Sequence, residues 1–73
     1  MEEYITEKVI NLSENIPGAL NVLGNLIIKK GLDSFLIICN KLEDQKITGS
    51  KIWVIYKDVG QDIEKFYDYI NEK

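Results

Sequence analysis

The sequence predicts an all-helical fold, a compact bundle of four to five short helices that forms a single domain over residues 1–73. Two observations support this prediction. Apolar residues recur every three or four positions in successive segments, which is the spacing of one face of an α-helix. Glycine and proline separate these segments, so the connections between helices are short. A chain of 73 residues with one cysteine has no internal disulfide, and its stability depends on the 45% of its residues that are hydrophobic.

The first two helices are expected at about 3–13 and 17–30. Pro17 marks the boundary between them, because the residue before a proline avoids the helical conformation and proline suits a first helical turn. Gly31 is expected to end the second helix in a left-handed conformation. The apolar residues that carry the helical spacing here are Ile5, Val9 and Leu12, then Leu20, Leu23 and Ile27.

A third helix is expected to begin at Asp33 or Ser34, either of which is a suitable N-cap, and to reach about Gln45. The turn at 47–50 then leads to a fourth helix that ends near Val59. Asp62 is expected to cap a final helix, and Gly60 to end the fourth.

The segment 51–56 is rich in β-branched and aromatic residues, so a buried strand is the alternative to the fourth helix. We favour a helix because Ile52, Ile55 and Val59 keep helical spacing and the sequence offers no second strand to pair with it. The expected core of the bundle comprises Leu20, Leu23, Ile27, Phe35, Ile38, Leu42, Trp53, Phe66 and Ile70.

The chain lacks the side chains that most often carry catalysis. It has no histidine, the commonest general base and metal ligand. Cys39 lies on the apolar side of its helix with no base to activate it, and a buried core position is the better interpretation. Asp58 and Asp62 lie close in sequence, but the spacing matches no calcium loop. We therefore expect no enzymatic activity, no cofactor and no bound metal.

Net charge is unevenly distributed along the chain. The total is −3, but residues 1–28 and 58–73 each carry −3, whereas residues 29–57 carry +3. The basic segment 29–57 includes two predicted helices joined by a short turn, so a helix-turn-helix DNA-binding regulator is one interpretation. Its contacts would come from Lys41, Lys46, Ser50, Lys51 and Lys57. The absence of arginine and the apolar fourth helix count against it, and lysines that only keep the domain soluble are the simpler explanation.

Several large apolar side chains fall on the expected polar faces of the helices. These residues could form a patch that binds a partner. The ordinary explanation is that the predicted orientation of the helices is wrong by one residue, so that the same side chains belong to the core. Trp53 and Tyr56 are aromatic residues of the kind that anchor interfaces, and we expect a patch around them. The candidate partner-binding residues are Ile37, Trp53, Val54, Tyr56 and Tyr69, and Ile28 is a further apolar residue expected beside a polar face.

The chain is expected to be cytoplasmic. Its N-terminus is acidic, where a secretion signal carries positive charge, and no apolar run is long enough to cross a bilayer. A single thiol fits a reducing compartment.

Residues 49–59 (GSKIWVIYKDV) followed by 61–66 (QDIEKF), together with 16–20 (IPGAL), resemble small proteins encoded in phages and prophages of low-GC Gram-positive bacteria. The shared pattern concerns packing and capping, not catalysis. The resemblance implies an accessory protein of a mobile element, and no functional residue is carried over from it.

The sequence therefore predicts a small non-catalytic protein–protein interaction module, an accessory or regulatory protein of a phage or mobile element. Its partner is expected to be a protein, with a homodimer as one form of that interaction and no membrane involved. The alternative is the small helix-turn-helix-like DNA-binding regulator that uses segment 29–57.

Overall fold

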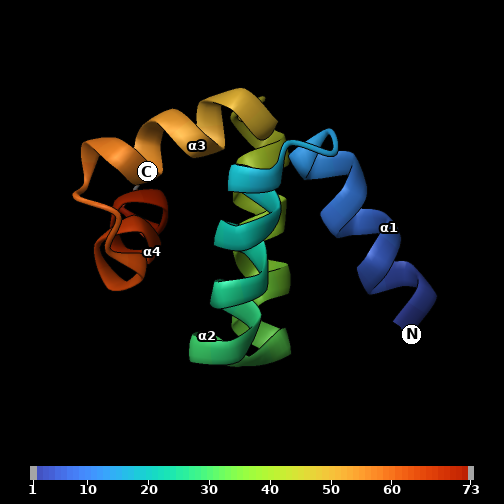
Figure 1. Cartoon of the computed structure of the whole chain (residues 1–73). Helices are drawn as coiled ribbons and strands as arrows, with labels where there is room; N and C mark the ends of the chain where they lie inside the picture. Colours follow the sequence, from blue (N-terminus) through green and yellow to red (C-terminus); the bar gives the residue numbers. More distant parts are fainter. Residues whose placement is uncertain (1, 73) are drawn as a thin grey trace.

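The computed structural model describes residues 2–72, and within that range the chain forms helices and no strand (Figure 1). The helices are α1 (Glu2–Ser13), α2 (Pro17–Asp44), α3 (Gly49–Asp58) and α4 (Ile63–Asn71). The all-helical prediction is confirmed, and segment 51–56 is helical as expected because it lies within α3. The Cα radius of gyration is 10.8 Å, close to the value of about 11 Å for a compact chain of this length.

Helix α2 is a hairpin of two helical arms. Its backbone leaves the helical conformation at Gly31, with φ 86° and ψ 165°, a combination essentially restricted to glycine. Figure 1 shows the chain descending as a first arm (residues 17–30) and returning behind it as a second arm (residues 32–44). The expected break at Gly31 is confirmed, but the expected left-handed helical cap is not, because a ψ of 165° lies outside that region. The expected N-cap at Asp33 or Ser34 is wrong, because Gly31 alone reverses the chain and both residues lie inside the second arm.

Asp62 and Gly60 occupy the cap positions of the shorter helices that the sequence predicts. The Asp62 side chain accepts a hydrogen bond of 3.1 Å from the backbone N–H of Lys65, in the first turn of α4. Gly60 has φ 75° in the turn between α3 and α4. Thr48 occupies the N-cap position of α3, but its side chain makes no cap hydrogen bond there. These short connections fold α4 back onto α2.

The turn between α1 and α2 is built around buried Ser13. Its hydroxyl donates to the Ile10 carbonyl at 3.2 Å and accepts from the Asn15 backbone N–H at 3.2 Å. The start of α3 lies directly against this turn, since a Cβ at Gly49 would collide with the carbonyl oxygen of Ser13. The close approach of the two backbones therefore requires glycine at position 49.

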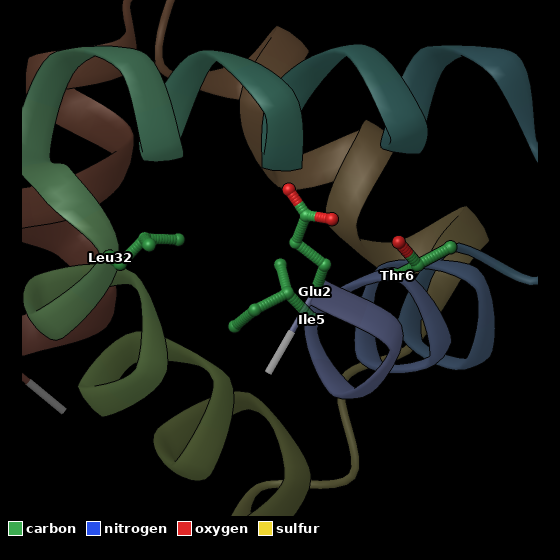
Figure 2. A pocket seen from close by; sticks show the side chains of 4 residues that line it. All are labelled: Glu2, Ile5, Thr6 and Leu32. Carbon is green, nitrogen blue, oxygen red and sulfur yellow. The ribbon is translucent and has the colours of Figure 1, made fainter.

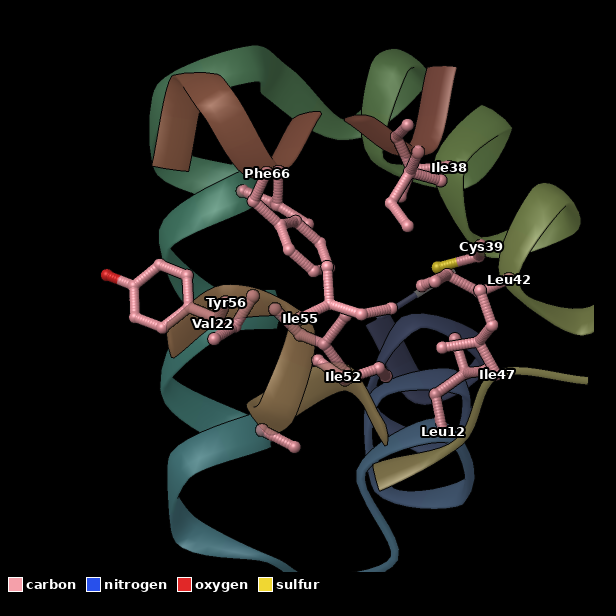
Figure 3. Packing of buried hydrophobic residues seen from close by; sticks show 14 of the residues in the cluster. Leu12, Val22, Ile38, Cys39, Leu42, Ile47, Ile52, Ile55, Tyr56 and Phe66 are labelled. Atoms are coloured by element: carbon pink, nitrogen blue, oxygen red, sulfur yellow. The ribbon is translucent and has the colours of Figure 1, made fainter. Parts of the chain in front are cut away.

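The core lies where α3 and α4 meet the α2 hairpin and the end of α1 (Figure 3). Six of the nine predicted core residues are fully buried: Leu23, Phe35, Ile38, Leu42, Phe66 and Ile70. Ile27 and Trp53 are partly buried and pack against this core, whereas Leu20 is partly buried and does not belong to it. On the first arm, the buried face consists of Ala19, Val22, Leu23 and Leu26, which is rotated by about one residue from the predicted face.

Between residues 2 and 72, none of the helices combines the length and the apolar character needed to cross a membrane.

Candidate protein-binding surface

Three of the residues predicted to bind a partner are exposed, and each stands on a different element. Ile37, on the second arm of α2, is 53% exposed, Val54 on α3 is 42% exposed, and Tyr69 on α4 is 37% exposed. Ile37 is the apolar residue on an otherwise polar outer face that also carries Asp33, Asn40 and Asp44. The structure thus confirms the exposure of these residues but distributes them over three helices.

The two aromatic residues expected to anchor the patch lie together but belong largely to the core. Tyr56 is only 8% exposed, and its ring lies between those of Trp53 and Phe66, at centroid distances of 5.9 and 6.3 Å. Trp53 is partly buried, and the ammonium of Lys57 lies 5.4 Å from its ring centroid. The expectation of an exposed patch around Trp53 and Tyr56 is therefore wrong, because α3 turns Tyr56 toward α4.

The residues of the DNA-binding alternative are distributed over the second arm of α2, the following turn and α3. The ammonium of Lys41 donates to the Asn71 carbonyl at 2.8 Å and so contributes to the end of α4. Lys51 and Lys57 are six residues apart on α3, which places them about 120° apart around its axis. Lys46 lies in the turn before α3, and it is exposed, as are Ser50 and Lys51.

Cys39 is not available as a nucleophile. It is fully buried, and burial raises the pKa of its thiol to about 12. The thiolate, which is the reactive form, is therefore negligible at neutral pH. No group of three potential metal-ligating side chains occurs among residues 2–72.

A groove opens between the start of α1 and the tip of the α2 hairpin. We call it the tip groove, and it is lined by Glu2, Ile5, Thr6 and Leu32, with a volume of about 290 Å³. Figure 2 shows the Leu32 side chain pointing from the hairpin turn toward α1, with Ile5 opposite it. Two aliphatic side chains thus face a space that none of residues 2–72 fills.

The groove lies where α1 moves away from the hairpin toward its N-terminus, although Ile5 and Val9 still pack against the core. At the C-terminal end of α1, Leu12 is 3% exposed and packs into the core. One turn earlier, Lys8 pairs with Glu43 of the second arm at 3.0 Å, and this hydrogen bond raises the pKa of Lys8. Toward its N-terminus α1 diverges from α2 (Figure 1), Ile5 is only partly buried, and Tyr4 is 51% exposed.

The outer edge of the tip groove is acidic. A neighbouring hollow is lined by Glu2, Glu3, Thr6 and Glu7, and it shares two residues with the groove. Within the part of the chain that the structure describes, the ion pairs are Lys8–Glu43 and Lys30–Glu64. Glu2, Glu3 and Glu7 therefore have no lysine from residues 2–72 within ion-pair distance.

Large apolar side chains are exposed on both sides of Gly31, at the tip of the hairpin. Ile28 is 79% exposed and Leu32 is 45% exposed. Sequence reasoning identified Ile28 as a residue beside a polar face but missed Leu32 and the groove-facing position of Ile5. The sequence gives no signal for the exposure of Leu32, because an apolar residue directly after a helix-ending glycine commonly packs against the last turn of that helix.

The chain matches no family model, and comparisons with curated proteins and with solved structures found none that is similar to it.

Proposed function

We propose that this protein is a small non-catalytic protein–protein interaction module of the cytoplasm, an accessory or regulatory protein of a phage or mobile element. The observation that carries the proposal is the exposure of Ile28 and Leu32, at 79% and 45%, near the hairpin turn, where Leu32 also lines the tip groove. In a domain this small, every apolar side chain left in water forgoes stabilisation that the fold needs. Apolar side chains gathered at one turn are therefore best explained by a partner that covers them.

The chemistry of the chain agrees with binding rather than catalysis. The single thiol is buried and protonated, and the chain has no histidine. The proposed place in a phage or mobile element rests on the resemblance of segments 16–20 and 49–66, which carries a packing pattern and no catalytic signature.

The alternative function, a helix-turn-helix-like DNA-binding regulator, has less support. Two of its five candidate residues are engaged within the chain, since Lys41 holds the Asn71 carbonyl and Lys57 lies over the Trp53 ring. The exposed face of α3 presents Val54 between its lysines, which leaves few polar groups to contact base edges.

Site-specific photo-crosslinking in the native host tests the proposed function. A benzoylphenylalanine at position 28 or 32 is expected to give a discrete covalent adduct with one other protein, or with a second copy of the chain. The matched control carries the same group at Asn40, which is exposed on the polar outer face of the second arm. Adducts of equal yield from all three positions, or none from positions 28 and 32, would reject the interaction module.

Fluorescence anisotropy with labelled duplex DNA separates the two functions. A DNA-binding regulator should bind at low salt and lose affinity steeply as salt rises, because its contacts displace counterions from phosphates. The interaction module is expected to show no binding up to about 100 μM, the weak end of ordinary non-specific affinity. Salt-sensitive binding that Lys46→Gln and Lys51→Gln weaken would establish the alternative instead.

A further inference from the structure

We infer that the tip groove binds an amphipathic helix of a partner protein, one that carries lysine or arginine beside its apolar stripe. This inference rests on the proposed function and adds the place, the secondary structure and the charge of the partner's binding segment.

The apolar part of the groove selects an aliphatic side chain. Ile5 and Leu32 face each other across it, and its volume of about 290 Å³ lies at the lower limit of pockets that hold small ligands. The groove is also open to solvent along α1. Such a site suits one or two side chains presented by a larger molecule better than a ligand that must be enclosed.

The charge at the edge of the groove selects a cation. Glu3 and Glu7 are four residues apart on α1, so their carboxylates are neighbours on its surface and repel each other. Neither they nor Glu2 forms an ion pair within residues 2–72. A lysine or arginine of the partner would relieve this repulsion while its aliphatic neighbour fills the groove.

The geometry favours a helix over an extended segment. The groove lies between the first turns of α1 and the turn of the α2 hairpin, and the described chain has no strand whose edge could add a further strand. An amphipathic helix in a groove between helices presents apolar residues at spacings of three and four, with charged residues alongside them.

A second copy of this chain fits the groove less well. The exposed helical faces of the chain that carry lysine offer isolated large apolar residues, as Val54 does on α3. Ile37 is likewise isolated on the outer face of the second arm. Neither face provides the apolar stripe that a helix-in-groove contact requires.

The experiment uses two labelled peptides of about 18 residues, long enough to form helix on binding. Both have leucine at helical spacing; one has lysine at the remaining positions, and the other has glutamate. The lysine peptide is expected to bind the full-length protein, to lose affinity as salt rises, and to shift the amide NMR signals of α1 and of residues 28–32. The glutamate peptide is expected not to bind.

Two pairs of matched variants locate the binding. The triple change Glu2→Gln, Glu3→Gln and Glu7→Gln should lower the affinity for the lysine peptide about tenfold. Each exposed ion pair contributes about two- to fivefold to an affinity. The control triple Asp44→Asn, Asp58→Asn and Glu72→Gln removes the same charge from the ends of other helices and should leave the affinity unchanged.

The second pair tests the apolar contact with similar changes of exposed area. Leu32→Ser should lower the affinity for the lysine peptide at least as much as the triple glutamate-to-glutamine change does. Ile37→Ser should leave the affinity unchanged, although Ile37 is the more exposed of the two residues. Both variants keep the glutamates of α1. The comparison therefore still tests the inference if the triple glutamate-to-glutamine change destabilises that helix.

Equal weakening by the groove and control variants, or equal affinity for the two peptides, would overturn the inference. Self-association of the protein alone that Leu32→Ser abolishes would also overturn it, in favour of a second copy. In each of these cases a position-specific crosslink from residue 28 or 32 would still uphold the proposed function. Loss of that crosslink would reject the proposed function itself.

Discussion

The indole of Trp53 lies in the space that a side chain on Gly18 would need. A Cβ at position 18 would come within 2.6 Å of two carbons of the ring, closer than any ordinary contact. Gly18 is in the first turn of α2, and Trp53 is in the middle of α3. The missing side chain of one residue therefore sets how closely the two helices approach, and it explains why Trp53 is partly buried at their junction.

Gly18→Ala should consequently destabilise the protein, although alanine is the better helix former. Forcing a methyl group against a packed ring costs about 1–3 kcal/mol, which outweighs the roughly 1 kcal/mol gained in helix propensity. The matched control is Gly24→Ala on the same arm, where a Cβ meets nothing within 4 Å, so a stabilisation of about 0.5–1 kcal/mol is expected. Urea unfolding followed by Trp53 fluorescence measures both. Opposite signs support the packing argument, and a stabilising Gly18→Ala would refute it.

Substitutions of Gly31 should destabilise the protein because of its backbone conformation, and not because a side chain would collide with a neighbour. A Cβ at this position meets nothing within 4 Å, but its φ of 86° and ψ of 165° are nearly inaccessible to other residues. Gly31→Ala is expected to cost about 1–3 kcal/mol. Gly31→Asn should be no better, because asparagine tolerates the left-handed helical region and not this one. Thermal unfolding by circular dichroism checks both variants, and full recovery by asparagine would show that the turn relaxes to a left-handed helical geometry.

The sequence predicts the helices well because their signals are local. The break at Gly31, the Asp62 cap and the helical spacing of segment 51–56 each depend on a few adjacent residues, and the structure confirms them. The tertiary features were harder to predict. The first arm is apolar around most of its circumference, so spacing alone does not decide between a face centred on Leu23 and Ile27 and one centred on Val22 and Leu26.

The same limit applies to the candidate surface. The exposure of Ile37 and Val54 follows from helical phase within a single element, so it was predictable. The burial of Tyr56 depends on where α4 packs, and the tip groove depends on α1 diverging from the hairpin at Leu32. Both are relations between elements distant in sequence, and no spacing pattern encodes them.

Asp62→Ala should destabilise the protein by about 1 kcal/mol, within the usual range of about 0.5–2 kcal/mol for the loss of an N-cap. The change removes the acceptor for the Lys65 N–H and leaves that donor without a partner in the first turn of α4. Asp62→Ser should recover most of the loss, since serine is a good N-cap. Asp58→Ala, an exposed acidic residue at the end of α3, is the charge-matched control and should have little effect. Urea midpoints compare the three variants, and equal losses for Asp58→Ala and Asp62→Ala would point to net charge as the cause.

The buried thiol of Cys39 should make stability fall at alkaline pH. Burial raises the pKa of this thiol from its ordinary value of 9.0 to about 12, so above pH 9 the unfolded chain releases a proton that the folded chain retains. Ionisation then favours the unfolded state, and stability is lost progressively between about pH 9 and pH 12. At pH 10 the free energy of unfolding should be about 1.4 kcal/mol lower than at pH 7 on account of this group alone.

Cys39→Ala isolates the thiol from the lysines and tyrosines, which titrate in both proteins. The variant is expected to be less stable at pH 7 because it leaves a small cavity, and the gap to the wild type should narrow by about 1.4 kcal/mol at pH 10. Urea unfolding of the two proteins at both pH values gives this difference directly. A gap that stays constant would mean that Cys39 ionises in the folded state as readily as in the unfolded chain.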